Sequence, residues 1–145
     1  MTFLIDTNVL LRIVQRDHKL HGVVRSTIKQ LRSDGHRFNI SAQNCIEFWN
    51  VVTRPLAQNG FGLTPNEANS LLKLVERLFP ILPANNETYH IWRRLVLELQ
   101  ISGIQVHDCH IVAAMLSVGI TGIVTFNEPD FNRYKSHGIL VVVPK

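Results

Sequence analysis

Cysteine is scarce in this sequence, and its spacing excludes the classes of protein that depend on it. The 145 residues include only two cysteines, Cys45 and Cys109, which are far apart and form no Cys-x-x-Cys pair. A disulfide framework or a cysteine zinc site needs more thiols at closer spacing. We therefore expect both thiols to be buried in the core.

Long apolar runs are also missing. No segment approaches the roughly 20 consecutive apolar residues of a membrane-spanning helix. An acid, Asp6, interrupts the N-terminal region before any apolar stretch reaches the length of a secretory signal. Internal repeats, low-complexity tracts and linkers are absent too. We expect residues 1–145 to form one domain, in the cytoplasm and without a membrane partner.

Negative charge is the scarcer sign. The chain has 11 acidic residues against 15 lysines and arginines, which gives a formal net charge of +4. This balance is compatible with an anionic partner such as nucleic acid but does not require one. Arginines could contact RNA phosphates, although scattered arginines are usually solvated or paired. The candidates are Arg54, Arg93, Arg94 and Arg133.

Short apolar segments rich in Ile, Val, Thr and Phe predict about five strands, most of them ending at polar residues. They are TFLID (2–6), RFNIS (37–41), FPILP (79–83), ITGIVTF (120–126) and GILVVVP (138–144). Between them, apolar residues three or four positions apart predict helices. The clearest helix spans residues 64–79, where Thr64, Pro65 and Glu67 form a capping-box start.

Two further helices are predicted over residues 86–103 and 107–119, each stopping at a glycine. Strands that alternate with helices, without a strong hairpin signal, indicate an α/β sandwich with a mainly parallel sheet. Two helical stretches between Ser41 and Phe79 have no clear strand between them, which suggests a small helical projection.

Acidic and amide residues gather after the predicted strands and at the starts of helices. Ligands of an open parallel sheet bind outside the carboxyl ends of its strands, so we expect these groups to converge there. They are Asp6 and Asn8 after the first strand, Glu47 in the helical turns after the second, Asp108 at a helix start, and Asn127, Glu128 and Asp130 after the strand at 120–126.

A cluster of carboxylates is costly without a cation, because like charges raise one another's pKa. Oxygen ligands from Asp, Glu and Asn suit Mg²⁺ or Mn²⁺ rather than a metal that prefers thiolates. Such an ion can orient a phosphodiester and activate water. The constellation therefore predicts metal-assisted phosphodiester hydrolysis.

Four segments of the chain resemble the PIN domain family, and within it the small VapC-like toxins. They are LIDTNVLL, SAQNCIEFWNVVTRP, VHDCHIVAAM and IVTFNEPDF, which together span the chain. The resemblance implies a three-layer α/β sandwich and a Mg²⁺- or Mn²⁺-dependent endoribonuclease that cleaves RNA. It also implies a toxin neutralised by a cognate antitoxin, and a homodimer.

The resemblance also assigns catalytic and metal-binding residues by position. Asp6, Glu47 and Asp108 match the metal-binding acids of the family. Asn127 and Asp130 both fall in the stretch that supplies the fourth ligand, and the choice between them stays open at this point. Asn127 would supply an oxygen but no charge.

Each acid also has a purely structural interpretation. Asp6 could cap the helix that begins at Thr7, and Asp108 could favour a helix start through the macrodipole. Glu47 could face water from the polar side of its helix. Any one of these acids alone would be weak grounds for a site.

Neighbouring polar residues are ambiguous in the same way. Asn8 could orient the first acid and Thr125 could bind the cluster, although both suit ordinary helix and strand ends. His107 and His110 are three residues apart and raise a zinc alternative, but the sequence offers no third ligand nearby.

Other functions fit the sequence less well. A phosphatase with an aspartyl nucleophile needs a second Asp two residues after the first, where this chain has Asn8. A receiver domain needs adjacent acids after the first strand, and these are absent. The remaining alternative is a catalytically weak PIN-like module that binds RNA or protein. The amphipathic helices between Trp49 and Phe79 offer an apolar surface for a partner.

Overall fold

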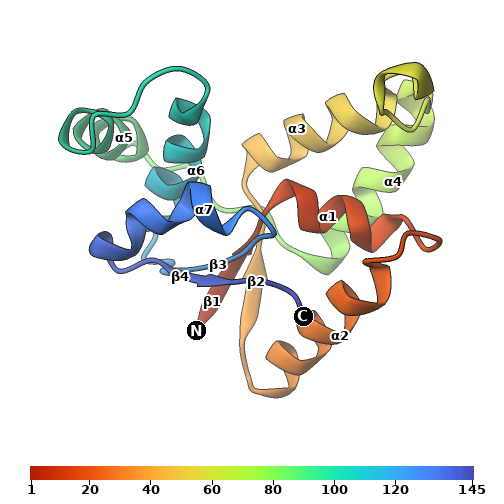
Figure 1. The fold of residues 1–145 in the computed structure, drawn as a ribbon, viewed down its shortest axis with the longest axis horizontal. Coiled ribbons are helices and arrows are strands. Elements are labelled where there is room, and N and C mark those ends of the chain that lie inside the picture. The colour runs from red at the N-terminus through yellow and green to blue at the C-terminus, as the bar shows by residue number, and fades with distance from the viewer.

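A four-stranded parallel sheet forms the centre of the computed structural model, which describes all 145 residues (Figure 1). The strand order is β2-β1-β3-β4, and every neighbouring pair is parallel. The strands are β1 (Thr2–Ile5), β2 (Arg37–Asn39), β3 (Gly122–Val124) and β4 (Leu140–Val142). All four carboxyl ends therefore lie at the same edge of the sheet.

The segment FPILP does not form the fifth strand that its composition suggests. It contributes one isolated parallel bridge, between Ile40 and Ile81. Proline has no backbone N–H to donate to a ladder, and Pro80 and Pro83 flank this bridge. The sheet therefore has four strands, and the expected parallel α/β arrangement is otherwise confirmed.

Seven α-helices surround the sheet, and two short 3-10 helices follow α3 and α7. The helices are α1 (Thr7–Val14), α2 (His21–Ser33), α3 (Ala42–Thr53), α4 (Pro65–Leu78), α5 (Thr88–Glu98), α6 (Gln105–Ser117) and α7 (Glu128–Phe131); the 3-10 helices are Leu56–Gln58 and Asn132–His137. The predicted capping box at Thr64 is present, with the Thr64 and Glu67 side chains each bonded to the other's backbone N–H. None of the helices is long and apolar enough to cross a membrane.

Helices cover both faces of the sheet and make the three layers that the resemblance implies. In β1, successive side chains point to opposite faces, so Phe3 and Ile5 join one core while Leu4 joins the other. The first core lies against α1 to α4, and the second against α5 to α7. Both cysteines are buried, Cys45 in the first core and Cys109 in the second.

The predicted helical projection is formed by α3, the 3-10 helix Leu56–Gln58 and α4. Figure 1 shows α3 and α4 together on one side of the molecule, with α5 and α6 on the other. The N-terminal ends of α1 and α3, together with the first turn of α6, come to the carboxyl edge of the sheet. Asp6, Glu47 and Asp108 lie on or next to these elements, and Glu128 and Asp130 lie on α7.

Candidate active site

Asp6 lies directly after β1 and is buried at the N-terminus of α1. Its Oδ1 accepts a hydrogen bond from the Thr7 backbone N–H at 2.8 Å, so the predicted helix cap is present. Its Oδ2 accepts a second bond from the Thr125 hydroxyl at 2.7 Å, across from the end of β3. Asp6 is therefore a helix cap and also part of a contact between two strand ends.

Burial raises the pKa of Asp6, and the charges of Glu47 and Asp130 act in the same direction. The hydrogen bonds from Thr125 and Thr7 oppose this increase by favouring the charged form. A helix cap alone would not bring acids from other segments close to its carboxyl. The carboxyl of Asp6 is thus surrounded by acids that come from other segments.

Glu47 is half-buried on α3 and faces α1 rather than open water. Its Oε2 accepts a hydrogen bond from the Thr7 hydroxyl at 2.7 Å. The Asn44 amide donates to the same hydroxyl oxygen at 3.0 Å, which leaves the Thr7 proton for Glu47. Asn44 in turn belongs to the capping box that starts α3 at Ser41. The start of α3 and the start of α1 therefore hold Glu47 together.

Asp108 lies in the first turn of α6 but does not cap the helix. The N-cap residue is Ile104, and no side-chain cap bond is present. The pKa of Asp108 is raised to about 7, first by burial and then by the charges of Asp6, Asp130 and Glu47. Its carboxylate takes no hydrogen bond from the protein. The macrodipole at a helix start would lower this pKa, so the acidic neighbours outweigh the helix.

Asn127 and Asp130, which the sequence left as alternatives, are bonded to each other. The Asn127 amide donates to Asp130 Oδ2 at 2.6 Å, and the Asn127 backbone N–H donates to the Thr125 hydroxyl at 2.9 Å. The charge of Asp130 raises the pKa of both Asp6 and Asp108. Asp130 thus faces the cluster, with Asn127 holding it in place.

Other polar residues near the cluster vary in their contribution. Thr125 binds Asp6 directly, whereas Asn8 makes only long contacts, at 3.4 Å to Asp6 and at 3.3 Å to the backbone of Phe126. Glu128 instead pairs with Lys135 at 3.6 Å, on the exposed side of the last turns. The sequence placed Glu128 among the candidates, but it makes its ion pair outside the cluster.

Three residues that sequence reasoning missed organise the cluster: Thr7, Asn44 and Gln43. Thr7 is adjacent to Asp6, and Gln43 precedes Glu47 by four residues, a spacing that places two side chains on one helix face. Asn44 occupies the third position of its helix, where capping-box side chains lie. Spacing alone could therefore have suggested these residues as neighbours of the acids.

The donor set fits a hard divalent cation. Asp6, Glu47, Asp108 and Asp130 offer only oxygen atoms, and the charges of the other three acids add to burial in raising the pKa of Asp108. No three His, Cys, Asp or Glu side chains of the structure converge closely enough to hold an ion together. Each acid except Asp108 is instead bonded to a neighbouring side chain. The zinc alternative at His107 and His110 has no third ligand.

A model of the PIN domain family matches residues 3–136. The chain belongs to the PIN domain family. Among proteins of curated function, none matches the sequence. The resemblance identified from the four motifs is thus confirmed at the level of the family.

Several solved structures have a fold similar to that of this PIN domain. VapBC2 from Rickettsia felis, bound to a DNA fragment from its promoter, has a TM-score of 0.75 at 15% identity, covering 100% of both chains. DNA-bound VapBC from Salmonella typhimurium has a TM-score of 0.71 at 19% identity, covering 99% of this chain and 98% of the other. VapC20 from Mycobacterium tuberculosis, a sarcin-ricin loop cleaving toxin, has a TM-score of 0.60 at 14% identity, covering 95% and 96%. At these identities the likeness is one of fold.

Proposed function

We propose that this PIN domain is a Mg²⁺- or Mn²⁺-dependent endoribonuclease and the toxin of a toxin-antitoxin pair. The observation that carries the proposal is the placement of acids from four segments, Asp6, Glu47, Asp108 and Asp130, at the carboxyl edge of the sheet, where burial and the other three acids raise the pKa of Asp108 to about 7. Acids arranged in this way are costly unless they serve a cation. A sarcin-ricin loop cleaving toxin among the structures of similar fold supports RNA as the substrate.

Asp6, Glu47, Asp108 and Asp130 would hold the cation, with the Asn127 amide fixing Asp130. When bound, Mg²⁺ or Mn²⁺ would offset negative charge that develops on the phosphate and would lower the pKa of the attacking water. The protein's own side chains would fix the geometry of these ligands. Thr125 and the backbone N–H of Thr7 hold the two oxygens of Asp6, and the Thr7 hydroxyl holds Glu47.

Asp108 has a different task in this scheme. Because the protein donates no hydrogen bond to its carboxylate, both oxygens are free for a ligand. Arg133 is the one cation that lowers the pKa of Asp108. Of the four arginines proposed to meet RNA, it is the one that we place at the site. Arg93 and Arg94 are exposed on α5 instead.

RNA cleavage by the purified protein tests the proposal. We expect cleavage with Mg²⁺ or Mn²⁺ that stops in excess chelator and is largely lost in Asp6→Asn and Asp108→Asn. Asp17→Asn, at an exposed acid beyond α1, is the matched control and should cleave normally. Undiminished cleavage in chelator would refute the metal. RNA binding by the wild type without cleavage would favour the alternative, a PIN-like binding module.

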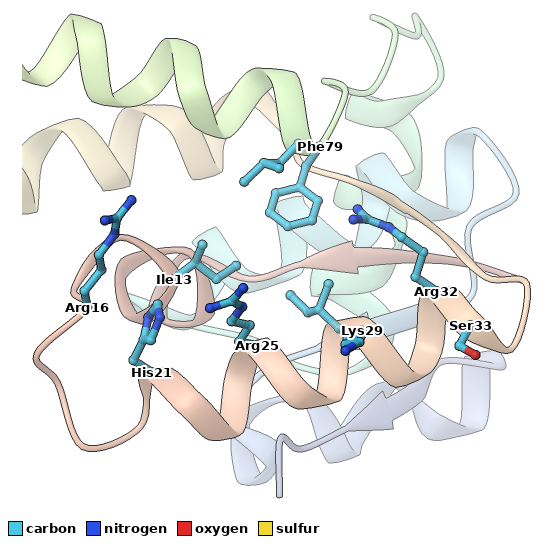
Figure 2. Close-up of a pocket in the computed structure, with 10 residues that line it drawn as sticks. Ile13, Arg16, His21, Arg25, Lys29, Arg32, Ser33 and Phe79 are labelled. Carbon is cyan, nitrogen blue, oxygen red and sulfur yellow. The ribbon is translucent and has the colours of Figure 1, made fainter.

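A groove beside α2 supports an antitoxin partner (Figure 2). It is formed by the end of α1, by α2 and by the end of α4, and its apolar residues are Ile13, Ile28, Leu78 and Phe79. Its cations are Arg16, Arg25, Lys29 and Arg32. None of these cations forms an ion pair within the chain, whose only ion pairs lie elsewhere. We propose that an acidic, amphipathic antitoxin segment docks here.

Of the apolar surface predicted on the helices between Trp49 and Phe79, the end of α4 contributes to this groove through Leu78. Arg25→Glu combined with Lys29→Glu should abolish co-purification with the product of the neighbouring gene, whereas Lys73→Glu on the exposed side of α4 should not. Equal capture by the wild type, the double variant and Lys73→Glu would refute docking in this groove.

We also propose a homodimer, supported by the exposed apolar residues Ile46 and Ile104. Sedimentation as a monomer at high micromolar concentration would contradict the dimer.

A further inference from the structure

The two helices that carry Glu47 and Asp108 are joined by a single side chain, Gln43. Its Nε2 donates to Glu47 Oε1 at 3.1 Å, on its own helix, and to the backbone oxygen of His107 at 2.8 Å, on α6. Its Oε1 lies 2.8 Å from His110 Nδ1, one turn further along α6. No other side-chain hydrogen bond connects α3 with α6.

The orientation of the Gln43 amide follows from its partners. A backbone carbonyl only accepts hydrogen bonds, so the nitrogen of Gln43 must face His107, and the carboxylate of Glu47 requires the same nitrogen. The remaining oxygen of Gln43 then accepts from His110, which places a proton on His110 Nδ1. Two independent partners, Glu47 and the His107 carbonyl, therefore fix one orientation, and the half-buried Gln43 side chain is held through both its nitrogen and its oxygen.

Gln43 acts on both acids through these contacts. Glu47 Oε2 is fixed by Thr7, and Gln43 fixes the other oxygen, so the carboxylate cannot rotate freely. On α6, the two residues that Gln43 holds lie on either side of Asp108 in the sequence. Glu47 and Asp108 carry like charges, and the bonds from Gln43 to Glu47 and to the His107 backbone hold α3 and α6 together against their repulsion.

We infer that Gln43 is a positioning residue that sets the spacing of Glu47 and Asp108 and thereby the affinity of the site for its divalent cation. The inference rests on the proposed function, because it assumes that these two acids bind the same ion. Groups that orient a metal ligand from behind typically change metal affinity about 10- to 100-fold when they are removed. Gln43 touches neither the ion nor the RNA in this scheme.

Gln43→Met is the variant of choice, because methionine keeps the length of the side chain and removes all three hydrogen bonds. We expect the dissociation constant for Mn²⁺, measured by calorimetry in the absence of RNA, to rise about tenfold or more. RNA cleavage should need a correspondingly higher Mn²⁺ concentration for half-saturation, with a smaller change in the rate at saturating Mn²⁺. Gln30→Met on α2, where Gln30 bonds only to Asp34, is the matched control and should bind Mn²⁺ like the wild type.

A second variant distinguishes the link that Gln43 makes between α3 and α6 from its local contact with Glu47. His110→Ala leaves both Nε2 bonds possible and removes only the anchor of the Gln43 oxygen. If Gln43 acts through its link to α6, His110→Ala weakens Mn²⁺ binding, and the double variant binds Mn²⁺ no more weakly than Gln43→Met alone. Additive effects of the two changes on Mn²⁺ affinity would contradict a role for Gln43 through its link to α6.

The outcomes also distinguish this inference from the proposed function. Equal Mn²⁺ affinity of the wild type and Gln43→Met, with metal-dependent RNA cleavage intact, would overturn the role of Gln43 and leave the function standing. Failure of the wild type to bind Mn²⁺ would overturn both. Weaker Mn²⁺ binding by Gln43→Met, with no RNA cleavage by either protein, would support the role of Gln43 and contradict the nuclease.

Discussion

Asp108→Asn should make the protein more stable while it removes activity. The pKa of Asp108 is raised from 3.8 to about 7, mainly by burial and by the neighbouring acids. A pKa difference of 1 corresponds to about 1.4 kcal/mol, so the rise from 3.8 to about 7 would cost about 4 kcal/mol when Asp108 is ionised. Because Asp108 is partly open to solvent, which screens such interactions, we expect about half of this, or about 2 kcal/mol.

The sign follows from proton linkage. The folded protein keeps the proton on Asp108 up to about pH 7, whereas the unfolded chain loses it near pH 4. The folded state therefore binds more protons between these values, and this residue makes the wild type less stable as pH rises through that window. Asparagine is nearly isosteric and carries no charge, so the stability advantage of the variant should be small near pH 4 and reach its maximum above pH 7.

Urea unfolding in excess chelator measures the effect. The free energy of unfolding of Asp108→Asn should exceed that of the wild type by about 2 kcal/mol at pH 8 and by much less at pH 4.5. Asp17→Asn, at an exposed acid outside the cluster, should show no such pH-dependent gain. Adding Mg²⁺ should then stabilise the wild type more than the variant, since a ligand stabilises the state that binds it. A variant that is no more stable than wild type at pH 8 would refute the acidic cluster.

Two further predictions concern residues that support the cluster and the sheet. Thr125→Val removes the hydroxyl that binds Asp6 Oδ2 and should cost about 1 to 3 kcal/mol of stability and weaken Mn²⁺ binding, whereas Thr125→Ser should retain both. Equal Mn²⁺ titrations of the two variants would contradict this role. Gly122→Ala should cost about 1 to 3 kcal/mol in thermal or urea unfolding, because an added Cβ would lie 2.5 Å from Phe3 Cδ1. An unchanged unfolding midpoint would show that the Phe3 ring can move aside.

Local sequence signals predicted the features that depend on contacts between residues close together in the chain. The capping box at Thr64 predicted the start of α4, because the bonds that satisfy the first turn come from residues within three positions. The alternation of apolar segments predicted the parallel α/β class, since each element must bury its own face. The position of Asp6 after β1 likewise followed from the end of a short apolar run.

Backbone chemistry and the placement of side chains decided two points that the sequence predicted wrongly or left open. FPILP has the composition of a strand, but only one bridge forms because Pro80 and Pro83 cannot extend the ladder. The sequence left Asn127 and Asp130 as alternative ligands, and the structure shows that the Asn127 amide donates to Asp130, whose charge raises the pKa of Asp108.

The environment of Asp108 is the clearest case of a property that only the tertiary structure decides. Asp6, Glu47 and Asp130 lie far from Asp108 or on other elements, and no local pattern reports the distances between them. The sequence alone determined which elements form and which acids stand at their ends. The packing of α1, α3, α6 and α7 around the sheet determined that these acids lie close enough for their charges to interact. Charge interactions depend on separation in space and on burial rather than on order along the chain.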